Sequence, residues 1–313
     1  MIVQDDLIDC GGRLGNQLFQ LAAIITLAIE NNTDAKLPPN IYEKEVVGQK
    51  CLLYNFKHGL QTYTEDEYKV AKLNCLNVCL PAMCQDSNNS FRKEFRLLRN
   101  KNIFLRGFPE SEHYFKHNKS TILEKIQLQD SLQEYGRQYI KELKDKYAKE
   151  TGIENPEVVG IHIRRGDDRQ LLTPDGIILF THKQWEKFPL SVNKMKEHSF
   201  SDKKYIFLVF CGGTRNETGT EKEDMEYIKR LYLNTNTFYC DIQNTINEFA
   251  IMTACDHFIL TARSTFSWWG AYLIKNPNKK VVALINNPTN APINPPVFYP
   301  DEWIKLDYEL IKV

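Results

Sequence analysis

The sequence lacks an excess of charge of either sign. Its 313 residues include 40 lysines and arginines and 40 aspartates and glutamates, so the formal net charge is zero. A neutral chain has no general attraction to nucleic acid or to an anionic membrane. Nucleic acid is therefore not an expected partner, and an anionic ligand has to be held by a few well-placed cations.

Long apolar runs are also absent. The longest, residues 18–29, is too short to span a bilayer and contains Gln20. The first ten residues contain no lysine or arginine, so they lack the basic start of a signal peptide. We expect no transmembrane segment and a cytoplasmic location.

Clustered metal ligands are missing as well. The eight cysteines are spread along the chain, with no Cys-x-x-Cys pair and no matching pair of histidines. Without a secretion signal, the cysteines are expected to be reduced thiols. We therefore expect no metal site.

The second half of the chain alternates between apolar strand patterns and helical patterns. This alternation predicts an α/β fold with parallel strands. Strands are expected at 157–163, 205–210, 257–262 and 280–285, and helices at 221–233, 246–254 and 265–274.

The first half alternates less cleanly. A strand is expected at 2–9, a helix at 16–30, a strand at 103–108 and a helical region at about 120–149. In that last region one helical face carries Leu132, Tyr135, Tyr139, Leu143 and Tyr147. The segment 151–156 breaks the pattern, which predicts two domains, 1–155 and 156–313.

The stretch GGRLGNQLFQ, residues 11–20, places glycines between the first strand and the first helix. Glycine lets the backbone approach a ligand closely, and a helix N-terminus attracts anions. The stretch matches neither Gly-x-Gly-x-x-Gly nor a phosphate-binding loop with its Lys-Ser/Thr ending. Taken alone, a tight turn and an anion site remain equally good interpretations.

A second candidate site is GIHIRRGDDR, residues 160–169, where a buried strand ends in charged residues. In open α/β sheets, ligands bind beyond the carboxyl ends of the strands. Arg164 and Arg165 there could grip the oxygens of a diphosphate. The alternative is a salt-bridged strand end, with an arginine paired to Asp167 or Asp168.

The third candidate lies at residues 254–273, where a strand is followed by a helix that opens with Ser264 and Thr265. Hydroxyls at a helix start either cap the helix or help to hold a phosphate. The tryptophans of STFSWW are more typical of core than of a platform for a base. Asp256, just before the strand, suits either a nucleoside contact or a surface turn.

Together these segments resemble the α-1,2-fucosyltransferase family, so the chain looks like a member of glycosyltransferase family 11. That family is related to the α-1,6- and protein O-fucosyltransferases. The likeness covers nearly the whole chain. It is carried by GGRLGNQLFQLA (11–22), LRGFPESEHYF (105–115), HIRRGDD (162–168), STFSWWGAYL (264–273) and FYPDEWIKLD (298–307).

The resemblance implies a GT-B architecture, two Rossmann-like domains facing across a cleft, with an acceptor-side N-terminal domain and a donor-binding C-terminal domain. It implies a GDP-fucose donor, a galactose-terminated glycan acceptor, inversion at the anomeric carbon, and no metal or other cofactor. The implied donor-binding residues are Gly15, Asn16, His162, Arg164, Arg165, Asp256, Ser264, Thr265 and Phe266.

Within that set, the resemblance assigns Arg164 to the donor phosphates and the leaving GDP. The catalytic base is not identified by the sequence, and Asp167 and Asp168 are the nearest carboxylates. The family usually has Ser-Asp-Asp where this chain has Cys211-Gly212-Gly213. Two alternatives stay open. One is a GT-B transferase with a different nucleotide-sugar donor or acceptor linkage; the other is a non-catalytic nucleotide-sugar-binding protein, which this departure supports.

Overall fold

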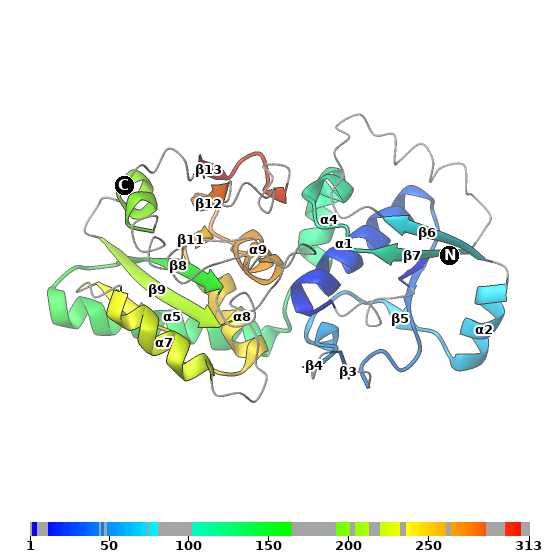
Figure 1. The fold of residues 1–313 in the computed structure, drawn as a ribbon, viewed down its shortest axis with the longest axis horizontal. Helices are drawn as coiled ribbons and strands as arrows, with labels where there is room; N and C mark the ends of the chain where they lie inside the picture. The colour runs from blue at the N-terminus through cyan, green and yellow to red at the C-terminus, as the bar shows by residue number, and fades with distance from the viewer. Residues whose placement is uncertain are drawn as a thin grey trace, which may run out of the picture. The chain divides into compact units, whose positions relative to one another are not determined.

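The computed structural model describes residues 2–4, 12–43, 45–46, 49–73, 75–80, 102–164, 192–200, 204–212, 220–231, 236–260, 264–285 and 298–307. The chain divides into two compact units, Met1–Gln129 and Asp130–Val313. Each unit has its own parallel sheet (Figure 1). The predicted α/β class with two Rossmann-like units is confirmed.

The sheet of the first unit has the strand order β5-β2-β1-β7-β6, and all of its pairs are parallel. The strands are β1 (Ile2–Gln4), β2 (Ala35–Leu37), β5 (Gln61–Thr62), β6 (Cys75–Leu80) and β7 (Asn102–Gly107). A separate antiparallel pair is formed by β3 (Glu45–Val46) and β4 (Gln49–Lys50).

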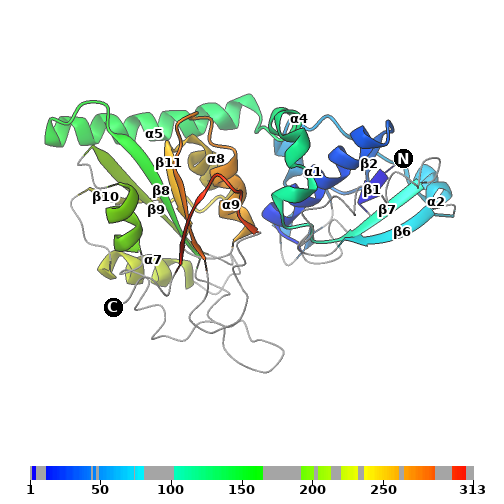
Figure 2. The same cartoon turned by 90° about the horizontal axis from the view of Figure 1, so that it is seen from above.

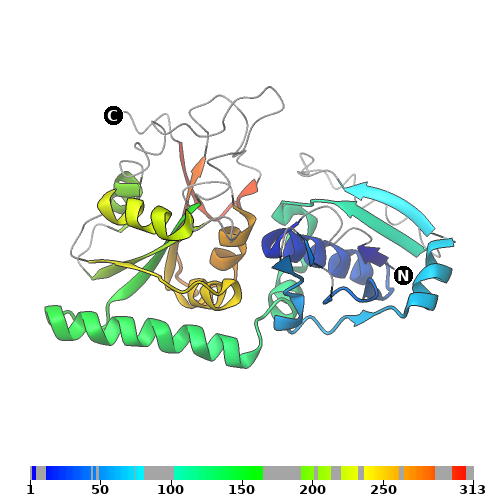
Figure 3. The same ribbon diagram turned by 60° about the horizontal axis from the view of Figure 1, so that its bottom comes forward.

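Helix α1 (Leu14–Glu30), dark blue in Figure 3, packs against β1 and β2. It is buried along nearly its whole length because its residues from Leu18 to Ala28 are mostly apolar. The remaining helical elements of this unit are α2 (Glu65–Leu73), α4 (Lys119–Lys125), and the short η1 (Leu53–Asn55), η2 (Glu112–Tyr114) and η3 (Lys116–Asn118).

The sheet of the second unit has the order β10-β9-β8-β11-β12-β13, again with parallel pairs throughout. Its strands are β8 (Glu157–Arg164), β9 (Tyr205–Gly212), β10 (Thr237–Tyr239), β11 (His257–Leu260), β12 (Val281–Ile285) and β13 (Ile304–Asp307). Its helices are α5 (Asp130–Thr151), α7 (Thr220–Leu231), α8 (Thr245–Ala254), α9 (Thr265–Tyr272) and a helical segment over 192–199.

Both faces of this second sheet are covered, which explains why its central strands are continuously apolar. On one face Ile161 and Ile163 of β8 pack with Val192 and with Ile228 of α7. On the other face Gly160 lies against Phe258 and Cys255, on the side of α8. Figure 2 shows α5 running beside α8.

Helix α5 belongs to the second unit, whereas the sequence analysis placed the domain boundary behind it, at 155/156. The structural division falls at Gln129/Asp130, because α5 packs against α8. The predicted apolar face of α5 is also only partly right. Its buried residues are Gly136, Ile140 and Tyr147, while Tyr135 is exposed. The spacing of the tyrosines predicted that a neighbouring face of the helix is buried. In the structure Gly136 lies against Ala250 of α8, and its lack of a side chain allows the two helices to approach closely.

Among the described residues, every helix is either too short or too polar to cross a bilayer.

Candidate functional site

The carboxyl ends of β8 and β11 form the topological switch point of the second unit. Counting from β8, the order of this sheet is 3-2-1-4-5-6, so the chain leaves the two central strands in opposite directions. Ligands of open α/β sheets bind in the crevice that this divergence creates. His162 lies near the end of β8, and Ser264 precedes α9 beyond the end of β11.

An aromatic contact joins these two strand ends. The His162 ring centroid lies 6.1 Å from that of Phe266, which in turn lies 5.3 Å from that of Phe249 in α8. His162 is buried and Phe266 half-buried. The structure therefore brings together two of the predicted donor-binding residues, from segments about a hundred residues apart in the sequence.

Ser264 is the N-cap of α9. Its hydroxyl oxygen accepts a hydrogen bond from the Ser267 N–H at 3.4 Å, and its carbonyl accepts one from the Ser267 hydroxyl at 3.3 Å. The capping interpretation of Ser264 is confirmed. Thr265 and Phe266 form the first turn, where backbone N–H groups of a helix have no partner within the helix. The start of α9 thus faces the switch point as a polar, electropositive end.

The two tryptophans of this helix belong to the core. Trp268 and Trp269 are fully buried, and the Trp268 Nε1–H donates to the Phe298 carbonyl at 2.9 Å. Trp268 also stacks on Tyr272, with 4.5 Å between the ring centroids. The prediction that these rings are core rather than a base platform is confirmed.

Arg164 is the last residue of β8 and pairs with Gly212 of β9. Arg165, Asp167 and Asp168 lie outside the described residues. The departure from the family pattern at Cys211-Gly212 falls within β9 itself, and Cys211 packs against the core of the second unit. Gly213 lies outside the described residues.

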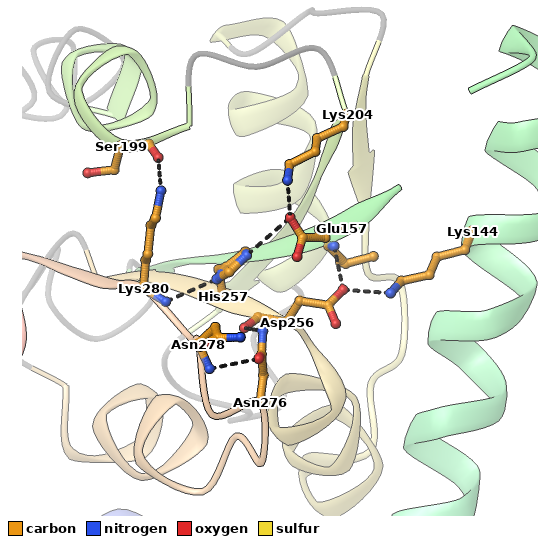
Figure 4. Close-up of polar contacts among 10 residues, drawn as sticks. Lys144, Glu157, Ser199, Lys204, Asp256, His257, Asn276, Asn278 and Lys280 are labelled. Atoms are coloured by element: carbon orange, nitrogen blue, oxygen red, sulfur yellow. Dashed lines mark hydrogen bonds and ion pairs between the residues drawn. The ribbon is translucent and has the colours of Figure 1, made fainter. Parts of the chain in front are cut away.

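Asp256 does not join the other predicted site residues. Its carboxylate accepts a hydrogen bond from the Val158 N–H at 2.8 Å and pairs with Lys144 at 2.6 Å (Figure 4). Val158 is the second residue of β8, six residues before Arg164, which is about 20 Å along a strand. Asp256 therefore lies at the amino ends of the strands, opposite the switch point. The expected contact with guanine does not fit this position.

A partly exposed polar network around the buried His257 lies beside Asp256 at this amino end. His257 Nδ1 accepts from the Lys280 N–H at 3.0 Å, and its Nε2 lies 3.6 Å from Glu157 Oε2 (Figure 4). Burial lowers the pKa of His257, although Glu157 opposes the shift. Burial raises the pKa of Glu157, but Lys204 at 3.0 Å together with His257 leaves it below its ordinary value. These contacts tie the starts of β8, β9 and β11 together.

The first unit has a switch point of its own. Counting from β1, its strand order is 3-2-1-5-4. From β1 the chain continues to β2 on one side, whereas the neighbouring β7 follows β6, which lies on the other side. Gly15 is buried in the first turn of α1, and Asn16 follows it, half-buried. The Arg13 side chain makes no capping hydrogen bond to α1. The first turn of α1 contains no acidic residue. The first turn of α1 therefore carries no carboxylate of its own that would repel an anion.

Gly12 is confined on two sides. A β-carbon at this position would lie 3.0 Å from Phe108 and 3.0 Å from the Asn16 β-carbon. The tight-turn interpretation of the loop stays a prediction. The packing at Gly12 shows only that a larger side chain would need Phe108 or Asn16 to shift. It does not exclude the anion interpretation for Gly15 and Asn16, which stays a prediction.

Two functional candidates were missed by the sequence analysis. Gln17 and Gln20 are buried in α1 and hydrogen-bond to backbone carbonyls. The signal was present, since Gln20 interrupts an apolar run, but it was used only as evidence against a membrane span. Among the described residues, no three His, Cys, Asp or Glu side chains gather as a metal ion would need. Independence from metal ions remains a prediction.

A comparison with models of known protein families identifies the family of this chain. The family model "Glycosyl transferase family 11" matches residues 5–307. The chain belongs to glycosyl transferase family 11. That match spans both switch points and both units.

Among relatives of this family 11 chain, "Galactoside 2-alpha-L-fucosyltransferase SEC1" of Bos taurus is 22% identical over 85% of the chain and 63% of the relative. "Galactoside alpha-(1,2)-fucosyltransferase 1" of Rattus norvegicus is 25% identical over 84% of the chain and 62% of the relative. The chain thus spans less than two thirds of either relative.

A solved structure of a mutant Arabidopsis thaliana FUT1 in complex with GDP has a similar fold. Its TM-score is 0.51 at 11% identity, and the match covers 91% of this chain and 70% of that one. At this identity the likeness concerns the fold alone. It agrees with the GT-B class expected for a family 11 protein.

Proposed function

We propose that this protein is an inverting fucosyltransferase, which transfers L-fucose from GDP-β-L-fucose to the 2-hydroxyl of a terminal galactose in a glycan. The observation that carries the proposal is the family 11 match over residues 5–307, with His162, Ser264 and Phe266 gathered at the switch point. The names of the relatives support the transfer of fucose, the galactoside acceptor and the α-1,2 linkage. The GDP bound in the similar Arabidopsis thaliana structure supports a guanosine diphosphate sugar as the donor.

In this proposal the donor nucleotide occupies the crevice at the carboxyl ends of β8 and β11. Phe266, half-buried beside His162, offers an aromatic surface for the nucleoside. Helix α9 begins at Thr265, and the N–H groups of its first turn donate hydrogen bonds to phosphate oxygens. Arg164, at the end of β8, supplies positive charge for the same phosphates, supported by Arg165.

The reaction forms one bond and breaks one. The acceptor oxygen O2 attacks the anomeric carbon of fucose, the bond from that carbon to the diphosphate oxygen breaks, and GDP leaves with the electron pair. The configuration changes from β to α. We infer that Arg164 and the N-terminus of α9 stabilise the charge on the leaving diphosphate, without a metal ion. The acceptor proton goes to a general base, for which Asp167 is the candidate.

The test is a transfer assay with purified protein, GDP-fucose and a terminal β-galactoside. We expect a fucosylated product, unchanged turnover in EDTA, and a loss of roughly 10²–10³ in kcat for Arg164→Ala. An Arg164→Ala variant that is folded and fully active would contradict the mechanism. Loss of turnover in EDTA with rescue by a divalent cation would contradict the metal-free reaction.

The two alternatives give different outcomes in binding measurements. A specific guanosine site predicts that GDP raises the Tm strongly and UDP little. Stronger protection by UDP would favour another nucleotide sugar. Protection by GDP-fucose without any transfer or release of fucose would favour a non-catalytic binding protein.

A further inference from the structure

Ser267 carries a fully buried hydroxyl group in the first turn of α9, beside the switch point of the second unit. It is 0% exposed and lies three residues after the cap residue Ser264, which is also buried. The Ser267 N–H donates to the Ser264 hydroxyl at 3.4 Å, and the Ser267 hydroxyl donates back to the Ser264 carbonyl at 3.3 Å. Two hydrogen bonds thus tie Ser267 to the residue at which the helix begins.

Stability does not account for this hydroxyl. The Ser264 carbonyl already accepts a hydrogen bond from the Trp268 N–H at 2.9 Å, so it stays paired when the Ser267 hydroxyl is removed. Alanine fills nearly the same space and has the higher helix propensity. A serine hydroxyl that bonds back to a carbonyl of the preceding turn slightly destabilises and bends a helix. The hydroxyl therefore points to a role in the geometry of the first turn.

The Ser264 carbonyl belongs to the same peptide group as the Thr265 N–H. A peptide group is planar, and in its trans form the C=O and N–H bonds point in opposite directions. The described residues contain no cis peptide bond. The carbonyl points along α9, toward Ser267 and Trp268, so the Thr265 N–H points out of the helix start, where the helix offers it no acceptor. Holding the carbonyl therefore also sets the direction of this N–H.

We propose that Ser267 is a positioning residue for the donor site. Its hydroxyl holds the peptide group between Ser264 and Thr265, so that the Thr265 N–H keeps one direction, toward the crevice that receives the donor's diphosphate. Every residue in this argument belongs to the second unit, as do His162 and Phe266. The inference rests on the proposed function, which places phosphate oxygens at the first turn of α9.

The effect is expected in the recognition of the diphosphate. Ser267→Ala keeps the Thr265 N–H but no longer holds its direction, so the loss should be smaller than the roughly 10²–10³-fold cost of removing such a donor. We expect kcat to fall about tenfold and GDP to bind about tenfold more weakly. Guanosine has no phosphate for this N–H, so its affinity should change by less than about twofold. A general distortion of the crevice would weaken GDP and guanosine alike.

Two further variants separate the hydroxyl from packing. Ser267→Thr keeps a hydroxyl that can bond to the carbonyl three residues earlier, so it should retain most of the GDP affinity and of kcat. The matched control is Thr253→Val in α8. The Thr253 hydroxyl makes the same kind of bond, to the Ala250 carbonyl at 2.9 Å, but near the end of the helix that leads to the amino end of β11. Its removal should leave GDP affinity and kcat unchanged.

The experiment measures kcat with GDP-fucose, the affinities for GDP and guanosine by calorimetric titration, and the Tm of wild type and the three variants. A wild type without transfer activity would contradict the proposed function itself. The ratio of GDP to guanosine affinity tests the positioning role separately from transfer.

Three results would overturn the positioning role. The first is a Ser267→Ala variant with the wild-type ratio of GDP to guanosine affinity. The second is an equal loss in folded Ser267→Ala and Ser267→Thr, because packing would then be responsible. The third is loss of the fold in Ser267→Ala, because the hydroxyl would then be needed for stability.

Discussion

The Asp256 carboxylate and the Lys144 ammonium group form an ion pair of 2.6 Å between the start of β11 and α5. The same carboxylate accepts the Val158 N–H, so it joins two neighbouring strands and a helix. Asp256 therefore has a structural role at the amino ends of the strands.

The first prediction follows from this contact. Asp256→Asn removes the ion pair but keeps an oxygen for the Val158 N–H, and should lower the free energy of unfolding by about 1 kcal/mol. Asp256→Ala also removes the acceptor and should cost about 1–3 kcal/mol. Urea unfolding measures both changes. GDP affinity should stay within about twofold, and a folded Asp256→Asn variant with tenfold weaker GDP binding would restore a role in the donor site.

The second prediction concerns the packing of α5 on α8. A β-carbon at Gly136 would clash with the backbone carbonyl of Ala250, and that backbone cannot move aside as a flexible side chain can. Gly136→Ala should therefore destabilise the protein by about 1–3 kcal/mol. This is opposite to the gain of about 1 kcal/mol that alanine gives in an open helix.

The control for Gly136 is Ser131→Ala, an exposed position in the same helix. It should leave the free energy of unfolding nearly unchanged. Equal stability of Gly136→Ala and wild type would show that α5 and α8 pack less closely than described.

The third prediction concerns acid stability. Burial lowers the pKa of His257 below the ordinary value of 6.5, so the folded protein binds this proton less readily than the unfolded chain. Stability is then complete above about pH 6.5 and falls as the pH decreases through the folded-state pKa. The groups that face the ring are Glu157, Asp256 and Lys280, with Phe200 and Tyr205 packed against it.

His257→Gln should therefore make the decline in stability between pH 7 and pH 5 shallower than in wild type. The control is His198→Gln, at an exposed position. Urea midpoints across this range measure the effect. An unchanged slope in His257→Gln would show that this ring is not kept neutral by its surroundings.

The fourth prediction concerns the nucleoside surface. Phe266 is only half-buried, so replacing it affects the crevice more than the core. Stacking of a base on an aromatic ring contributes about 1–3 kcal/mol. Phe266→Ala should therefore weaken GDP binding about tenfold or more in calorimetric titration. Phe249→Leu, at a fully buried neighbour, should instead mainly lower the Tm; the reverse pattern would place the nucleoside elsewhere.

Much of the fold was predictable because local patterns decide it. The apolar runs gave the strands of the second unit to within a few residues, and Ser264 was a recognisable helix cap. The parallel pairing of these strands also followed the expected α/β class. Such features depend on residues that are close together in the sequence.

The errors arose where distant segments meet. The face of α5 could not be chosen from periodicity, because the close approach at Gly136 depends on Ala250. The hydrogen bond from Gln20 to Gly107 likewise joins segments that no local pattern connects. Asp256 is different. Asp256 directly precedes β11, whereas Arg164 is the last residue of β8. In a parallel sheet, strand direction alone would therefore have placed them at opposite ends.

The most direct test of the account is the product formed from GDP-fucose and a terminal β-galactoside by the wild-type protein, with the new linkage assigned by NMR. We predict an α-linked fucose on O2 of galactose. A different linkage would contradict the acceptor assignment. The absence of any transfer to galactosides, with GDP-fucose bound, would contradict the proposed activity.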